Sequence, residues 1–314
     1  MQSPWDAFSL ARFFIGAAVL IYAVRSDVLT RRVGDWCWWL FLVAGLTILE
    51  VQMAAEGWQS LYLLSPFYIA VFFASLWFEG EVMGDHVKRR DSGMVAALLN
   101  IGAFVVYGAQ LAQGADPFSP AGLRRLQLLS IPVMMLLAYL LYRTQLLSGG
   151  ADAKAFLSLA VLVPFFPDPL LNPLGPPAVF QAICPFVLAV FFSAAFFTLL
   201  NPAGLMFYNL ARGDTGRLMA FAYKLPLDKA RSKKFIWLSE SVEEGLRVYH
   251  YFRFRGQTGK WKRDQLDILE KEGEKKVWVQ PQIPFMVQLA AGFMFTFALG
   301  NIILYGLIRS ISGL

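Results

Sequence analysis

Residues 148–154 read Ser148-Gly149-Gly150-Ala151-Asp152-Ala153-Lys154 and lie between hydrophobic segments that are long enough to be membrane helices. A charge beside lipid is costly, so Asp152 is a candidate functional residue by default. The small residues before it allow another helix to approach its carboxylate closely. A carboxylate acting alone does little hydrolysis, so this role requires a second acid, and Asp27 is the candidate.

The composition predicts an all-α polytopic membrane protein. The chain has 314 residues, of which 57% are hydrophobic and only 16% are charged. A soluble domain normally carries about a quarter charged residues. The apolar residues form long blocks rather than the alternating segments of about ten residues that are typical of a membrane β-barrel. The first block is not followed by a signal-peptide cleavage site and a polar mature chain.

The positive charge is concentrated in residues 209–281, which hold 16 Lys and Arg against 10 Asp and Glu. In a membrane protein, such a region is typical of a cytoplasmic loop beside anionic lipid, and we do not expect nucleic-acid binding. Cys37 and Cys184 form no CxxC pair, and His86 and His250 lie in separate polar stretches. We therefore expect no metal site and no cofactor.

Hydrophobic segments predict about eight membrane helices. Their approximate ranges are 8–24, 36–53, 61–78, 94–112, 126–142, a sixth that begins at 149–152, 178–200 and 284–308. Most match the roughly 20 residues that cross a bilayer core. The sixth has only about a dozen residues before Pro164, too few to span about 30 Å. Asp152 is therefore expected at or just inside the membrane boundary.

Lys and Arg in the loops predict the orientation. They follow the first, third and fifth helices and fill the region after the seventh, whereas residues 164–177 contain none. Because positive loops face the cytoplasm, the N-terminus is predicted outside the cell and Asp27 and Asp152 at one cytoplasmic edge of the plasma membrane. In the basic region, the alternating residues Arg247 to Phe254 predict a β-strand.

Three stretches carry a family pattern. Residues 26–36 place Asp27 after the first helix, before a short basic loop and an aromatic-rich helix. Residues 149–154 are similar to a GxGD signature, and residues 277–285 resemble the segment that leads into a last membrane helix. In this order they resemble the type IV prepilin peptidase family, and specifically its archaeal preflagellin peptidases.

The resemblance implies an aspartic endopeptidase in which Asp27 and Asp152 are catalytic and Gly149, Gly150, Ala151 and Lys154 are supporting motif residues. It implies substrates that are archaellin or type IV pilin-like precursors, whose short basic class III signal peptides are removed at the cytoplasmic face. The implied domains are a membrane peptidase core (1–208), a cytoplasmic α+β domain (209–282) and a C-terminal membrane helix (283–314).

The chain departs from the family pattern in two places. Four helices rather than two separate the aspartates, which indicates an added hairpin near residues 58–125, and Ala151 replaces a glycine. The cysteine-rich methyltransferase unit of bacterial members has no counterpart, so we expect no N-methylation. Asp35 is expected to cap the second helix, and Lys154 either to anchor the chain at the membrane surface or to support Asp152.

Two other functions remain open. A protease resembling presenilin or signal peptide peptidase would share the GxGD idea, although its Tyr-Asp pair is missing because Ser26 precedes Asp27. A proton-coupled transporter would use Asp27 and Asp152 as a relay. Such carriers usually show inverted internal repeats, and the sequence displays none.

Overall fold

The computed structural model describes residues 6–59, 62–78, 102, 105, 107–109, 119–144, 147, 149–167, 184–251 and 257–312. The chain divides into two compact units. Unit 1 comprises Met1–Ala195 and Pro284–Leu314, and unit 2 comprises Phe196–Ile283. Each unit is described separately below.

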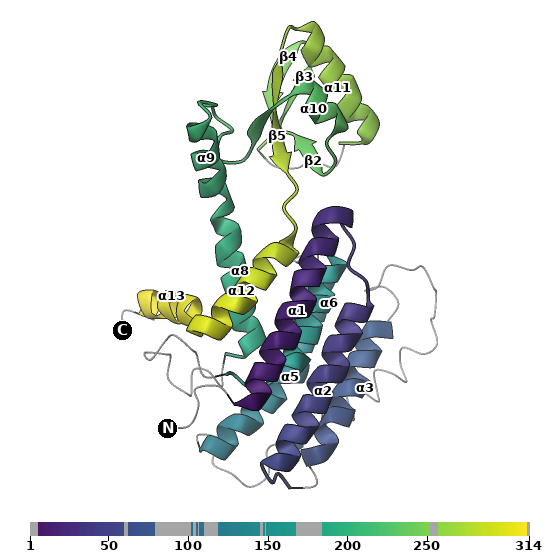
Figure 1. Cartoon of the computed structure of the whole chain (residues 1–314), viewed down its shortest axis with the longest axis vertical. Helices are drawn as coiled ribbons and strands as arrows, with labels where there is room; N and C mark the ends of the chain where they lie inside the picture. Colours follow the sequence, from purple (N-terminus) through teal and green to yellow (C-terminus); the bar gives the residue numbers. More distant parts are fainter. Residues whose placement is uncertain are drawn as a thin grey trace. The chain divides into compact units, whose positions relative to one another are not determined.

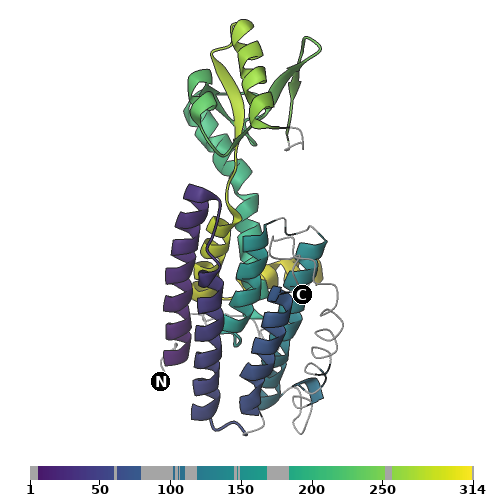
Figure 2. The same cartoon turned by 90° about the vertical axis from the view of Figure 1, so that its right-hand side faces the viewer.

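Unit 1 is helical (Figures 1 and 2). Its elements are α1 (Ala7–Thr30), α2 (Trp36–Ala55), η1 (Tyr62–Leu64), α3 (Ser65–Phe78), α5 (Pro120–Arg143), α6 (Gly150–Leu162), α8 (Phe186–Leu199, which continues into unit 2), α12 (Phe285–Leu299) and α13 (Ile302–Ser312). Among the described residues, four helices are long and apolar enough to cross a membrane: Ala7–Thr30, Trp36–Ala55, Ala121–Arg143 and Phe186–Ala211. Tyr62–Trp77 and Phe285–Leu299 are apolar but shorter. The chain is therefore a mostly helical membrane protein.

Helix α6 is the core of unit 1. Every residue from Ala153 to Leu162 is buried, and α6 packs against α1, α2 and α5. A helix that is apolar on all sides needs such enclosure by protein or lipid. Gly45 lets the α2 backbone lie close to the α6 backbone, because a Cβ at position 45 would lie 2.7 Å from the Val161 carbonyl oxygen. Small residues let membrane helices meet at backbone distance in this way.

Helix α12 also packs closely beside glycine residues, on two sides. A Cβ on Gly292 would lie 2.7 Å from the Val190 carbonyl oxygen of α8, and Phe293 of α12 fills the space beside Gly16 of α1. The α8–α12 contact also contains a buried hydrogen bond of 3.1 Å between the Ser193 and Thr296 hydroxyl groups. Close backbone packing and interhelical hydrogen bonds are the main attractions between membrane helices.

Two predicted helix ends are wrong. The first helix continues beyond Val24 to Thr30, so Asp27 lies inside α1 rather than after it. The predicted helix 284–308 is two helices, α12 and α13, because Gly300 adopts φ 74° and ψ −157° and ends α12. Glycine reaches this conformation without the steric cost that other residues meet. The predicted helix at 94–112 lies mostly outside the described residues, so the count of eight spans stays a prediction.

Unit 2 is a small α+β unit. Its elements are α9 (Asn201–Ala211), β1 (Tyr223–Pro226), α10 (Leu227–Ser232), β2 (Ile236–Leu238), β3 (Glu240–Glu243), β4 (Leu246–Tyr249), α11 (Gly259–Lys271) and β5 (Lys276–Pro281). The strands form an antiparallel sheet in the order β1-β5-β2 and a separate β3-β4 hairpin. Its hydrophobic core includes Leu266 and Leu269 of α11 and Val277 and Val279 of β5. The strand predicted over Arg247 to Phe254 is shorter: β4 ends at Tyr249, His250 and Tyr251 are not in a strand, and residues 252–256 lie outside the described ranges.

The close approach of α2 to α6 can be tested with Gly45→Leu. The added side chain would overlap the α6 backbone at Val161 and Leu162, and overpacking of this kind typically costs about 1–3 kcal/mol. We expect a lower melting temperature in detergent than for Gly204→Leu, a control in α9 where no atom lies within 4 Å of an added Cβ. Equal melting temperatures for the two variants would contradict the proposed packing.

Candidate active site

Asp27 lies near the C-terminal end of α1, where the helix is terminated by local hydrogen bonds. Arg31 adopts a left-handed conformation (φ 58°, ψ 27°), and its amide N–H donates to the Asp27 carbonyl oxygen over 2.9 Å. The Ser26 and Thr30 hydroxyl groups both donate to the Arg32 carbonyl oxygen, over 2.6 and 3.1 Å. These contacts hold the chain that follows Asp27 against its own helix end.

Asp152 lies in the first turn of α6, whose N-cap is Gly149. The amide groups of Asp152 and Ala153 donate to the Gly149 carbonyl oxygen over 3.1 and 3.2 Å. The Asp152 carboxylate folds back over Gly149, so a Cβ at that position would overlap it. Glycine is therefore required at position 149 to give the carboxylate its space. Ala151, the departure from the GxGD pattern, is half-buried and packs on the core of unit 1.

The structure brings Asp27 and Asp152 to the same place. Helices α1 and α6 are in contact (Figure 1). Both aspartates are half-buried. Their carboxyl groups are close enough to interact electrostatically, and Arg31 acts on Asp27 as a nearby positive charge. Among the hydrogen bonds of the described residues, none joins the two carboxyl groups directly. Such geometry often tightens only when substrate binds.

Lys154 has a partner that the sequence did not reveal. Its ammonium group donates to the Asp35 carboxylate over 2.6 Å and lies 4.9 Å from the centre of the Trp77 ring. The expectation that Asp35 caps α2 is wrong: it occupies the N-cap position, but its side chain makes no capping hydrogen bond. The Lys154 side chain is only 10% exposed, so it is not an anchor at the membrane surface. A lysine in a buried helix needs a partner, and that need was the available signal.

The ion pair joins the start of α2 to the first turn of α6. Lys154 is two residues after Asp152, so fixing Lys154 also fixes the turn that carries the carboxylate. Trp77 of α3 covers the ammonium group and is in ring contact with Trp39 of α2 and Phe73 of α3. Trp77, Trp39 and Asp35 therefore form a support for the candidate site that sequence patterns did not indicate.

No group of three or more His, Cys, Asp or Glu side chains capable of holding a metal ion occurs within the described ranges. Cys37 and Cys184 are both buried thiols. Glu79, Glu81, Asp85 and His86, which the sequence places in the added hairpin, lie outside the described residues. The arrangement in view is therefore a pair of carboxyl groups at helix ends with a buried cation beside one of them.

The described residues thus form a helical membrane protein with two aspartates near the ends of neighbouring helices. The family model described as Archaeal Peptidase A24 C-terminus Type II matches residues 216–302. A preflagellin peptidase of Methanococcus maripaludis is 26% identical over 178 residues, which is 55% of this chain and 71% of that protein. One from Methanocaldococcus jannaschii is 24% identical over 172 residues, 53% of this chain and 68% of that protein.

A third preflagellin peptidase, from Methanococcus voltae, is 27% identical over 166 residues, 50% of this chain and 65% of its own length. The chain is therefore similar to preflagellin peptidases over about half of its length. The relatives indicate a protease of the prepilin peptidase kind, and the apolar helices agree with a membrane protein.

The role of the Lys154–Asp35 pair can be measured with a double-mutant cycle. Asp35→Asn leaves a buried ammonium group without its counter-charge, whereas Lys154→Met removes that charge and keeps a side chain of similar length. We therefore expect Asp35→Asn alone to lower the melting temperature more than the double variant does, with a coupling energy of about 1 kcal/mol or more. Asp267→Asn, which breaks an exposed pair with Arg231, is the control. Simple additivity would contradict the pairing.

The position of the Asp152 carboxylate over Gly149 can be tested by substitution. Gly149→Ala places a methyl group where the Asp152 carboxylate lies, so the carboxylate must rotate away. Precursor cleavage should fall about a hundredfold in kcat, within the range for displacing an acid–base group, while the melting temperature changes little. Gly204→Ala in α9 is the matched control. Cleavage at the unaltered rate would show that the carboxylate does not need this position.

Proposed function

We propose that this chain is a membrane-embedded aspartic endopeptidase that removes short basic leader peptides from archaellin or type IV pilin-like precursors. The observation that carries the proposal is the placement of Asp27 and Asp152 within electrostatic range of each other, near the ends of two packed helices. The preflagellin peptidase relatives support the substrate class. The loop charges support a site at the cytoplasmic face of the plasma membrane, with the N-terminus outside.

The chemistry follows from two neighbouring carboxyl groups. When two such groups lie close together, repulsion between like charges favours the state in which one is ionised and the other holds a proton. The ionised carboxylate removes a proton from a water molecule as the water oxygen attacks the scissile carbonyl carbon. The protonated carboxyl group donates a hydrogen bond to the carbonyl oxygen, where negative charge develops. The tetrahedral intermediate then collapses as the carboxyl group that took the proton from water transfers it to the leaving amine, which returns that carboxyl group to its ionised state.

Two features of the site serve this reaction. Burial of α6 limits access of water to the carboxyl groups, which strengthens their electrostatic effect on a bound carbonyl group. The Lys154–Asp35 pair fixes the first turn of α6, so Asp152 does not have to be ordered when substrate binds. The mechanism needs no metal, no cofactor and no covalent intermediate, and methyl transfer to the new N-terminus is not part of the proposed activity.

Replacing either aspartate tests the proposal. An amide can neither remove a proton from water nor donate its proton to the substrate as an acid. We therefore expect Asp27→Asn and Asp152→Asn each to reduce cleavage of a purified precursor by about a thousandfold, within the range for general acid–base groups. Asp228→Asn is the matched control, because Asp228 is exposed on α10 in unit 2.

The outcomes separate the three functions. Loss in both variants, with cleavage by the parent enzyme unaffected by EDTA, supports the aspartic peptidase. Full cleavage in either variant would refute the pair as its catalytic centre. Failure to cut precursors while the protein cuts within a transmembrane helix of a test substrate would favour a presenilin-like protease. Proton-coupled uptake into proteoliposomes without any cleavage would favour the transporter.

A further inference from the structure

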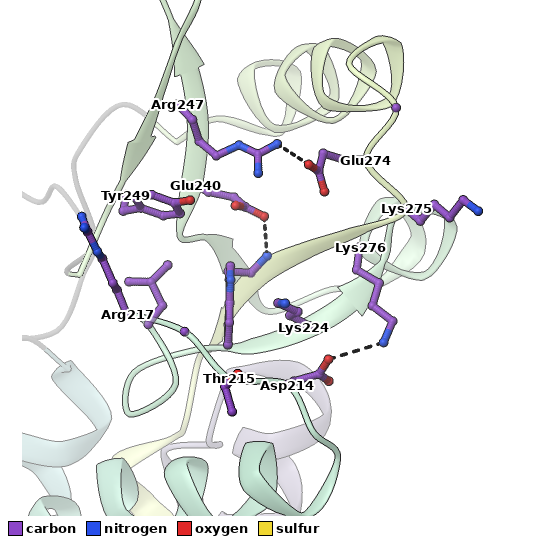
Figure 3. A pocket seen from close by; sticks show the side chains of 14 residues that line it. Asp214, Thr215, Arg217, Lys224, Glu240, Arg247, Tyr249, Glu274, Lys275 and Lys276 are labelled. Atoms are coloured by element: carbon purple, nitrogen blue, oxygen red, sulfur yellow. Dashed lines mark hydrogen bonds and ion pairs between the residues drawn. The ribbon is translucent and has the colours of Figure 1, made fainter.

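Unit 2 contains a cavity of about 870 Å³ that lies entirely within residues 214–278. Five Lys or Arg residues and three Asp or Glu residues line it: Arg217, Lys224, Arg247, Lys275 and Lys276, and Asp214, Glu240 and Glu274 (Figure 3). Its volume falls in the range of small-molecule sites. The loop at Gly216 lies against the Trp278 ring, where a Cβ would be 3.0 Å from a ring carbon.

The three carboxylates of this cavity already have partners. Glu274 accepts an ion pair from Arg247 over 2.8 Å, and Asp214 lies 3.4 Å from the ammonium group of Lys276. Glu240 is 3% exposed and accepts the backbone N–H of Trp278 over 2.7 Å. Burial raises the pKa of Glu240, and the hydrogen bond from Trp278 partly opposes that rise. The carboxylates therefore leave little negative charge uncompensated inside the cavity.

Three of the cations remain available. Within the described ranges, Arg217, Lys224 and Lys275 form no ion pair with a carboxylate, although they line the cavity. Figure 3 shows Lys224 in the middle of the site, with Arg217 and Lys275 at its two margins. The Lys224 ammonium group lies 5.1 Å from the centre of the Trp278 ring, and the buried Glu240 is within electrostatic range of it. With five cations against three carboxylates, the cavity thus keeps a surplus of positive charge.

We propose that this cavity binds a phosphate-bearing anion. Several unpaired cations in one cavity are best neutralised by a ligand that carries more than one negative charge, and phosphate oxygens accept several charge-assisted hydrogen bonds at once. The guanidinium group of Arg217 matches phosphate geometry, and the ammonium group of Lys224 supplies a point charge. The same positive surplus repels a basic leader peptide, so this cavity is not the site that reads the leader.

Phosphate can come from two sources. β5 ends at Pro281 and the apolar helix α12 begins at Phe285, so the headgroups of anionic lipids are one available source. Basic pockets beside membrane segments bind such headgroups. A soluble phosphate or pyrophosphate is the other source. Both present the same oxyanion to Arg217 and Lys224, and the experiment below distinguishes them.

The test uses the full-length protein in nanodiscs and measures local hydrogen–deuterium exchange. One arm adds inorganic pyrophosphate to discs of phosphatidylcholine alone, and the other compares these discs with discs that contain phosphatidylglycerol. We expect slower exchange at residues 214–218 and 273–276 in at least one arm. In the double variant Arg217→Gln/Lys224→Gln, the apparent affinity for pyrophosphate, read from its protection against exchange, should fall by about tenfold for each cation removed.

The matched control is Lys260→Gln/Arg263→Gln, which removes the same charge from the exposed face of α11 outside the cavity. Unchanged exchange in α11 and in unit 1 shows that both variants are folded. Protection by pyrophosphate alone assigns a soluble anion, and protection by phosphatidylglycerol alone assigns a lipid headgroup. Absence of protection in both arms, or an equal loss in the control, overturns the proposal. Neither result depends on Asp27, Asp152 or precursor cleavage.

Discussion

The rest of unit 1 depends on the burial of one short helix. α6 has 13 residues and is enclosed by α1, α2 and α5, so its polar first turn meets protein rather than lipid. Lipid offers no hydrogen-bond partners, so polar groups at this depth must be satisfied by neighbouring residues. Asp35 supplies the counter-charge for Lys154, and Asp27 lies within electrostatic range of Asp152. The enclosure that buries α6 therefore also assembles the candidate active site.

Much of the helical frame was predictable because membrane helices are recognisable in a sequence as long apolar runs. α1, α2 and α5 match such runs, and the short length of α6 follows from the prolines after it. Helix ends were less predictable. Residues 26–30 precede a basic loop, yet they continue α1 more than a turn beyond its predicted end, and the Ser26 and Thr30 hydroxyl groups bond to the backbone there. The break at Gly300 lies within a continuous apolar run, where hydropathy carries no information on backbone angles.

The candidate site was only partly predictable for the same reason. Asp152 is visible as an acid beside apolar segments, and family resemblance with loop parity named Asp27 as its partner. Lys154 and Asp35 are 119 residues apart, and no local period relates them. The two residues meet only because Gly45 allows α2 to lie against α6, and that contact is a property of the packed bundle.

Helix α3 contributes to the site through one aromatic residue. Trp77, near the end of α3, covers the ammonium group of Lys154. A cation held against a ring and shielded from water interacts more strongly with its counter-charge than an exposed one does. α3 therefore shields the ion pair that fixes the first turn of α6. A helix can in this way become part of the support for Asp152 without supplying a catalytic group.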